Sequence, residues 1–298
     1  MMDRKKLLLL YNPSAGRAQT SRNLDMLLQK FCTGGCETTV YPILDGLNAE
    51  DILAGAESAG YDIVVCCGGD GTLHHTVNAM AEAGLALPVG YLPAGSTNDF
   101  AASLHLPKDS VAAARVITSG IPTPIDVGQF NERYFVYVAS FGAFTQTSYT
   151  VPQPLKNALG HTAYMLEAVR QLPSINRSVT LSITADGEDL SGEYLFGSVS
   201  NSTSIGGLMK LSPDQVQLDD GKYELLLVKN PKNPLEIQAL ATALLTQNYG
   251  HTGIVYRHVS HVECIPQGEL PWTLDGEYAP SAAQVMIDNL HQAVTLMA

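Results

Sequence analysis

A glycine-rich turn at residues 67–72 constrains the fold more than any other stretch of the chain. Its sequence is Cys-Gly-Gly-Asp-Gly-Thr, and it directly follows the apolar run 63–66. That short, largely β-branched run predicts a buried strand, and residues 73–83 predict a helix beginning near Thr72. Glycines at a strand-to-helix turn let backbone N–H groups approach a phosphate closely, and the helix N-terminus favours the anion. The turn therefore predicts a phosphate site.

Asp70 lies inside this turn and would itself repel a phosphate. A carboxylate at that position suits a bridging metal ion or a hydroxyl proton. The alternative is that Asp70 only caps the following helix.

Two further turns of the same kind follow predicted strands. Residues 12–17, Asn-Pro-Ser-Ala-Gly-Arg, come after strand 6–11, and residues 93–100, Pro-Ala-Gly-Ser-Thr-Asn-Asp-Phe, come after strand 89–92. Small hydroxyl residues beside glycine suit phosphate or ribose contacts, although each turn alone could be an ordinary capping connection. Ligands of open parallel sheets bind at the carboxyl ends of the strands, so the three turns together predict one nucleotide site.

The first half of the chain alternates strands with helices, which predicts a parallel α/β sheet. Besides those already given, the expected elements are a strand over 37–43 and helices over 18–31 and 48–59.

From about residue 121 the pattern becomes rich in strands, which predicts a sandwich-like second domain. A hairpin is expected over 125–141 and a second one around Asp186-Gly187. The remaining expected elements are strands over 179–185, 192–201, 222–228, 255–265, 268–274, 284–287 and 293–297, and helices over 157–172 and 234–247. We expect domains at 1–122 and 123–287, with the last strands, about 288–298, returning to the first domain.

Acidic residues of the second half are candidates for catalysis. Asp126 interrupts an apolar strand, and Asp275-Gly276-Glu277 places two carboxylates on one tight turn. In such a pair, one carboxylate can hold a metal ion while the other polarises a hydroxyl. An exposed edge position for Asp126 and a surface hairpin turn for Asp275 are the alternatives. Asp220, directly before Gly221, is better explained from the residues alone as part of a turn.

Charge and cysteine content exclude several classes of protein. The 298 residues carry a formal net charge of −12, which argues against nucleic acid as a partner and against electrostatic recruitment to anionic membranes. No stretch approaches the roughly 18 apolar residues of a membrane span. The five cysteines are odd in number and no secretory signal is apparent, so we expect a reducing cytoplasm and no disulfide framework.

The motifs taken together resemble the diacylglycerol kinase catalytic family, and more narrowly its soluble bacterial lipid kinases. They are Asn-Pro-Ser-Ala-Gly at 12–16, Gly-Gly-Asp-Gly-Thr at 68–72, the segment 93–101 and Leu-Asp-Gly-Glu at 274–277. The resemblance implies a three-layer α/β nucleotide-binding domain, a β-sandwich-like C-terminal domain and an active site in the cleft between them. It also implies Mg²⁺-dependent transfer of the ATP γ-phosphate to a lipid hydroxyl.

The resemblance also implies roles for single residues. Glu277 matches the family's general base, and Asp70, Asp126 and Asp275 match a network that holds the catalytic Mg²⁺ through waters. Asp220, with the backbone carbonyls of Gln217 and Lys222, matches a structural Mg²⁺ site. The implied nucleotide-binding residues are Asn12, Pro13, Ser14, Gly16, Gly68, Gly69, Asp70, Gly71, Thr72, Gly95, Ser96 and Asn98.

Our hypothesis is a cytoplasmic lipid kinase that visits the inner face of the membrane transiently. Diacylglycerol or a related lipid alcohol is the expected acceptor, and the resemblance favours a homodimer. An NAD kinase-like small-molecule kinase shares the Gly-Gly-Asp-Gly-Thr motif, but residues 96–100 match the lipid kinases better. A non-catalytic nucleotide- or lipid-binding protein is the other alternative, and the complete set of four carboxylates speaks against it.

Overall fold

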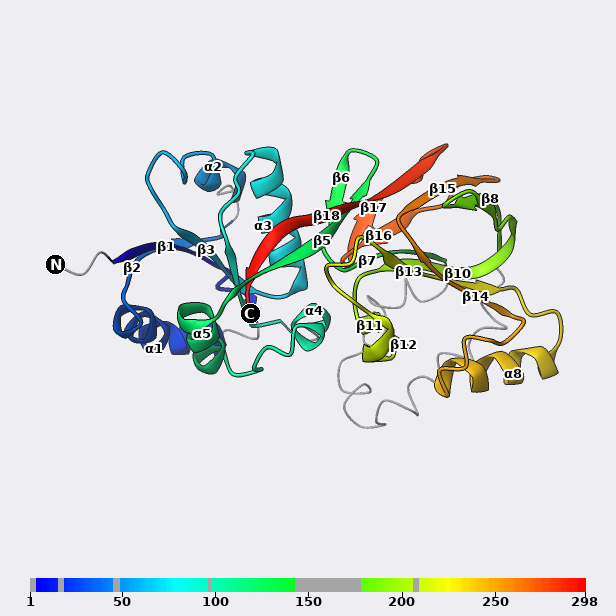
Figure 1. Cartoon of the computed structure of the whole chain (residues 1–298), viewed down its shortest axis with the longest axis horizontal. Helices are drawn as coiled ribbons and strands as arrows, with labels where there is room; N and C mark the ends of the chain where they lie inside the picture. The colour runs from blue at the N-terminus through cyan, green and yellow to red at the C-terminus, as the bar shows by residue number, and fades with distance from the viewer. Residues whose placement is uncertain (1–3, 16–18, 45–48, 96–97, 143–177, 206–208) are drawn as a thin grey trace. The chain divides into compact units, whose positions relative to one another are not determined.

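The computed structural model describes residues 4–15, 19–44, 49–95, 98–142, 178–205 and 209–298. The chain divides into two compact units, a first unit of Met1–Val127 with His291–Ala298 and a second unit of Gly128–Leu290 (Figure 1). From the sequence we expected boundaries near residues 122 and 288.

The first unit is built on a parallel sheet covered by helices on both faces. Strands β1 and β3 lie centrally and are buried on both faces, as parallel strands between two helical layers must be. The strand order is β2 (Cys36–Pro42), β1 (Lys5–Tyr11), β3 (Ile63–Gly68) and β4 (Val89–Pro93). Helices α1 (Gln19–Thr33) and α5 (Ser110–Ser119) pack on one face, and α2 (Ala49–Leu53) and α3 (Asp70–Glu82) lie on the other (Figure 1). A short helix, α4 (Asp99–Ser103), follows β4.

The second unit consists mainly of antiparallel strands around one apolar core. One group of neighbouring strands runs β14 (Ile254–Val259), β13 (Tyr223–Lys229), β10 (Gly192–Ser200), β7 (Val138–Gly142), β16 (Trp272–Leu274) and β17 (Glu277–Ala279). The other group contains β8 (Val179–Ala185), β15 (His261–Pro266), β18 (Val285–Met297) and β5 (Pro122–Phe130), with the short strands β6 (Arg133–Phe135) and β9 (Glu188–Asp189). The pairing of β10 with β8 joins the two groups into one continuous sheet, and β5 and β18 belong to the second unit only over residues 128–130 and 285–290. Residues of both groups share one apolar core, in agreement with the predicted β-rich second domain.

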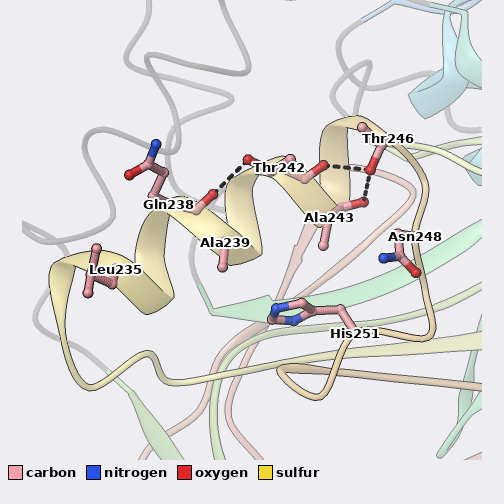
Figure 2. Close-up of a pocket in the computed structure, with 8 residues that line it drawn as sticks. All are labelled: Leu235, Gln238, Ala239, Thr242, Ala243, Thr246, Asn248 and His251. Carbon is pink, nitrogen blue, oxygen red and sulfur yellow. Dashed lines mark hydrogen bonds between the residues drawn. The ribbon is translucent and has the colours of Figure 1, made fainter.

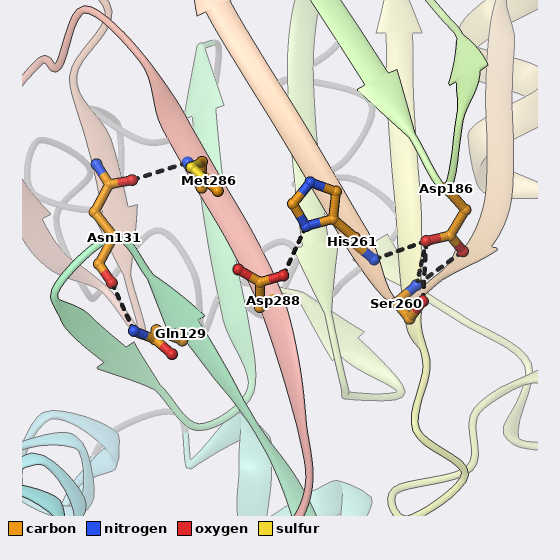
Figure 3. Close-up of polar contacts among 7 residues, drawn as sticks. All are labelled: Gln129, Asn131, Asp186, Ser260, His261, Met286 and Asp288. Carbon is orange, nitrogen blue, oxygen red and sulfur yellow. Dashed lines mark hydrogen bonds and ion pairs between the residues drawn. The ribbon is translucent and has the colours of Figure 1, made fainter.

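The strand expected over 255–265 is two strands, and Asp186 is the reason. The Asp186 carboxylate accepts hydrogen bonds from the backbone N–H and hydroxyl of Ser260 and from the N–H of His261 (Figure 3). These bonds bend the chain at Ser260, so β14 pairs with β13 whereas β15 pairs with β8 and β18. His261 Nδ1 also lies 2.6 Å from the Asp288 carboxylate of β18.

The expected hairpin over 125–141 is only partly correct. Strand β5 does pair with β6, but the chain then bends, and β7 pairs with β10 and β16 instead. The backbone N–H groups of residues 136–138 donate to the Asp275 carboxylate at this bend, so they are not available to continue the hairpin.

Three other expectations need correction, and one lies outside the described residues. Helix α2 ends at Leu53, well before residue 59, and residues 284–297 form essentially one strand, not two. Of the expected strand 268–274, only Trp272–Leu274 form a strand. Helix α5 was not predicted from the sequence. The expected helix 157–172 is not among the described residues.

Helix α8 (Pro234–Leu245) matches expectation and buries Leu240, Ala241, Ala243 and Leu244. Within the described ranges no helix has both the length and the apolarity to cross a bilayer.

Candidate active site

The structure brings the three turns of the first unit together, because β1, β3 and β4 are neighbours in the sheet. Asn12 donates its backbone N–H to the Cys67 carbonyl at 2.9 Å and its side-chain amide to the Thr72 hydroxyl at 3.1 Å. On the other side, the Ala94 N–H donates to the Gly68 carbonyl at 2.7 Å. The three turns therefore lie side by side at one edge of the sheet, and their binding of phosphate stays a prediction.

Gly69 and Gly95 allow the second and third turns to approach each other. A Cβ placed on Gly95 would lie 2.6 Å from the Gly69 Cα and 2.7 Å from Asn98 Oδ1. Asn98 has a φ of +51° and closes its turn by accepting from the Gly95 N–H and donating to the Gly95 carbonyl. Only glycine fits this crossing of backbones.

Asp70 is not the cap of α3, so that alternative is wrong. The N-cap is Gly69, without a side-chain cap bond, and Asp70 is the first helical residue. Its carboxylate accepts from the Asp99 backbone N–H at 3.0 Å and from the Tyr91 hydroxyl at 3.3 Å. Burial and the neighbouring Asp70 charge raise the pKa of the Tyr91 phenol, which keeps it a hydrogen-bond donor.

Asp126 is fully buried on β5, so the alternative of an exposed edge is also wrong. Its Oδ1 accepts from the Gln292 backbone N–H at 2.7 Å and lies 3.1 Å from His291 Nδ1. Both partners come from β18, more than 160 residues along the chain, and all three residues belong to the first unit.

Asp275 and Gly276 form a hairpin turn between β16 and β17, yet Asp275 is 3% exposed. Both residues have positive φ, +52° and +92°, as a type I′ turn requires. The Asp275 carboxylate accepts the N–H groups of residues 136, 137 and 138 at 2.7–3.0 Å. Glu277 begins β17 directly after the turn and is partly exposed. The turn thus holds the Asp275 carboxylate in hydrogen bonds and leaves the Glu277 side chain partly exposed.

Asp220 adopts the turn that its sequence favoured. Its Oδ1 accepts from the Lys222 N–H at 3.0 Å, and Gly221 has a φ of +78°. Gln217, Asp220 and Lys222 are all exposed. A structural metal at this turn stays a prediction.

The carboxylates of the site do not form a ready set of direct metal ligands. Among the described residues, no three His, Cys, Asp or Glu side chains converge as metal ligands. Asp275 already accepts three N–H groups, and a carboxylate offers about four acceptor sites. The fit is therefore better to a hydrated Mg²⁺, held through waters, than to a metal bound directly by this side chain.

Other expected residues divide between the turns and the undescribed segments. Pro13 and Ser14 lie in the first turn, where the Ser14 N–H donates to Asn12 Oδ1 at 2.9 Å. Gly71 and Thr72 lie in the first turn of α3. Gly16 and Ser96 lie outside the described residues. Cys66 and Cys67 are fully buried small apolar residues, and burial raises the pKa of the Cys67 thiol to about 12.

A pocket of about 410 Å³ beside α8 contains none of the expected site residues (Figure 2). Its lining carries no Lys, Arg, Asp or Glu and consists of Leu235, Gln238, Ala239, Thr242, Ala243, Thr246, Asn248 and His251.

Sequence reasoning missed the residues that hold the carboxylates. Tyr91 and Asp99 contact Asp70, and His291 and Gln292 contact Asp126. Asp99 lies inside the third motif, so that motif could have indicated it. The others carry no motif and come from distant parts of the chain.

Comparisons with known proteins agree with a kinase of this architecture. The diacylglycerol kinase catalytic domain model matches residues 6–130. The chain is 34% identical over 275 residues to a diacylglycerol kinase of Bacillus subtilis (strain 168), covering 92% of this chain and 90% of that protein. It is likewise 34% identical to a diacylglycerol kinase of Staphylococcus aureus (strain bovine RF122 / ET3-1), covering 92% and 87%. A crystal structure of a Bacillus anthracis diacylglycerol kinase superposes with a TM-score of 0.79 at 22% identity, covering 100% and 98%, which shows the shared fold.

The fold and the identity over nearly the whole chain define an ATP-dependent lipid kinase. The chain belongs to the diacylglycerol kinase catalytic family.

Proposed function

We propose that the protein transfers the γ-phosphate of ATP to the free hydroxyl of diacylglycerol or a closely related lipid alcohol. The observation that supports ATP binding is that the three turns lie side by side, since Asn12 contacts Thr72 and Gly69 contacts Gly95. The names of the 34%-identical relatives support diacylglycerol as the acceptor.

In this proposal the phosphates of ATP lie over the backbone of Gly68, Gly69 and Gly71, at the N-terminus of α3, with Asn12 and Ser14 beside them. Backbone N–H groups and the helix dipole favour an anion there. The lack of a Cβ at Gly69 and Gly95 lets the backbones of these two turns lie against each other.

Asp70, Asp126 and Asp275 would hold Mg²⁺ through its waters, and the ion would neutralise charge on the transferring phosphoryl group. Each carboxylate is oriented by at least one backbone N–H, from Asp99, Gln292 and residues 136–138 respectively. Such rigid orientation supplies electrostatic stabilisation without reorganisation during the reaction.

Glu277 would accept the proton of the lipid hydroxyl as that oxygen attacks the γ-phosphorus. Two features of Glu277 support this role. It lies immediately after the rigid type I′ turn, and its side chain is partly exposed, so a substrate that arrives from solvent can contact it. The proton then passes to solvent from the Glu277 carboxyl.

The test is transfer of labelled γ-phosphate from ATP to a panel of lipids in mixed micelles, with NAD as a control acceptor. The panel holds diacylglycerol, monoacylglycerol, phosphatidylglycerol and ceramide. We expect diacylglycerol to give the highest kcat/KM. Preferential labelling of NAD, or of no lipid, would contradict the proposal.

A further inference from the structure

One sheet face of the second unit has no role in the function proposed so far. Directly paired residues of antiparallel strands point to the same side of the sheet, and so do residues two apart on one strand. The register therefore places two rows on this face, first Thr273, Ser140, Ser198, Leu226 and Tyr256, and then Val138, Ser200, Glu224 and His258. Contacts agree: the Ser140 and Thr273 hydroxyls lie 2.9 Å apart, and Glu224 lies 3.8 Å from His258.

The central part of this face is buried and mixes polar with apolar residues. Ser198, Ser200 and Glu224 are each no more than 1% exposed, and the buried Val138, Phe196, Leu226 and Val228 lie on the same side. The opposite face of the same strands is apolar and carries Ala139, Phe141, Val199, Leu225 and Leu227 into the core. Buried polar residues cost free energy unless they are hydrogen-bonded, so their presence on this face needs an explanation.

Three polar groups on this face have no hydrogen-bond partner among the described residues. They are the Ser198 hydroxyl, Glu224 Oε2 and the Tyr256 hydroxyl. All three surround Leu226, because Ser198 and Tyr256 pair with it from either side and Glu224 is two positions away on β13. Buried polar groups are almost always hydrogen-bonded, so this cluster requires partners other than the described protein atoms, either buried waters or the polar groups of a ligand.

The chemistry of the face indicates what it receives. Hydroxyl, phenol and carboxyl groups donate to hydroxyl and ester oxygens and accept from hydroxyl groups. None of the nine residues in the two rows is Lys or Arg, so a buried phosphate would have no cation to balance it. The first row begins at Thr273 on β16, the strand that leads into the Asp275-Gly276 turn and Glu277.

We propose that this face, which we call the Ser198 face, binds the uncharged glycerol head of the lipid acceptor through its hydroxyl and ester oxygens. The Ser198 face then selects neutral glycerolipids over anionic phospholipids. This inference rests on the proposed lipid kinase function and adds the residues that recognise its acceptor.

The test removes single hydroxyls from the full chain with Ser198→Ala and Tyr256→Phe. Each change should raise KM for a short-chain diacylglycerol about three- to tenfold, the usual effect of losing one neutral hydrogen bond, while KM for ATP is unchanged. Thr38→Val is the matched control, because Thr38 also has a buried hydroxyl without a partner but lies in the first unit. It should leave KM for the acceptor unchanged.

A binding measurement separates this proposal from the proposed function. Isothermal titration calorimetry of the full chain with short-chain diacylglycerol or phosphatidylglycerol, without ATP, measures this binding directly. Diacylglycerol binding that depends on Ser198 but leads to no phosphate transfer would contradict the kinase proposal and support the Ser198 face. Phosphorylation of diacylglycerol with unchanged KM and unchanged binding in both variants would overturn the Ser198 face alone. A wild-type chain that neither binds nor phosphorylates diacylglycerol overturns both.

Discussion

At the scale of single residues, the carboxylates of the candidate site are held by backbone N–H groups. Asp70, Asp126 and Asp275 each accept at least one such bond, from Asp99, Gln292 and residues 136–138. Motifs singled out Asp70 and Asp275, and Asp126 stood out because it interrupts an apolar strand. Their partners could not be predicted, because a backbone N–H has no sequence signature and most of these partners come from distant strands.

The first prediction concerns Glu277, the residue directly after the hairpin turn. Glu277→Gln should lower kcat by at least about a hundredfold, because loss of a general base removes rate and not nucleotide contacts. ATP affinity, measured by equilibrium binding, should survive. A variant with near-normal turnover would remove Glu277 from the role of base.

Charge and hydrogen bonding at Asp70 can be separated by a pair of variants. Asp70→Asn keeps an oxygen that can accept from the Asp99 N–H but loses the negative charge, so it should raise the Mg²⁺ concentration needed for half-maximal activity and lower kcat. Tyr91→Phe removes only the phenol bond and serves as the control. A magnesium titration checks both, and an unshifted curve for Asp70→Asn would leave Asp70 without a metal role.

At the scale of elements, local patterns predicted the strands and the helices α1 and α3 of the first unit well, but not the end of α2 or the presence of α5. Its strands are short apolar runs bounded by turns, and β3 extends only two residues past the predicted run 63–66. The predictions failed where a side chain from elsewhere ends a strand. Asp186 breaks the segment 255–265 and Asp275 breaks 134–141, and neither event is visible in the apolar pattern of the segment itself.

Asp275 should therefore stabilise the bend between β6 and β7. Asp275→Asn has nearly the same shape, but its NH₂ group would face a backbone N–H where the carboxylate oxygen now accepts one. We expect a loss of about 1–3 kcal/mol in the free energy of unfolding, the usual penalty of an unsatisfied buried donor. Denaturant unfolding measures it, with Asp220→Asn on an exposed turn as the comparison. Equal midpoints for the two variants would show that the bend does not depend on this carboxylate.

At the scale of the whole molecule, the α/β and β-sandwich-like classes followed from the change of pattern near residue 121. The order of strands in the second unit did not, because β10 pairs with β13 along one edge and, along the other edge, with β8 at its start and β7 at its end. Strand pairing over long separations depends on side chains that meet only in the fold.

The free energy of unfolding should depend on pH because the Glu224 carboxyl is buried. Burial, and less strongly the charge of Asp220, raise the pKa of the Glu224 carboxyl to about 9. Between pH 4.5 and 9 the unfolded chain releases this proton whereas the folded chain keeps it. Stability therefore falls as the pH rises through this window, by up to about 1.4 kcal/mol per pH unit, and levels off above it.

Glu224→Gln mimics the neutral acid and should lack this slope. The measurement is urea unfolding of both proteins from pH 5 to pH 9, where the difference between the curves isolates the contribution of Glu224. Parallel curves would mean that Glu224 ionises in the folded protein much as it does in the unfolded chain.

Strand β18 gives the chain an order of assembly during synthesis. Leu296, near the last residue, pairs with Val89 of β4, and His291–Ala298 belong to the first unit. A ribosome that has released only the first 127 residues has therefore not yet supplied every strand of the nucleotide-binding unit. The second unit can be complete before the first, which reverses the usual order in which N-terminal domains fold before later ones. Closing the first unit must also await contacts of very high sequence separation, a feature that slows folding.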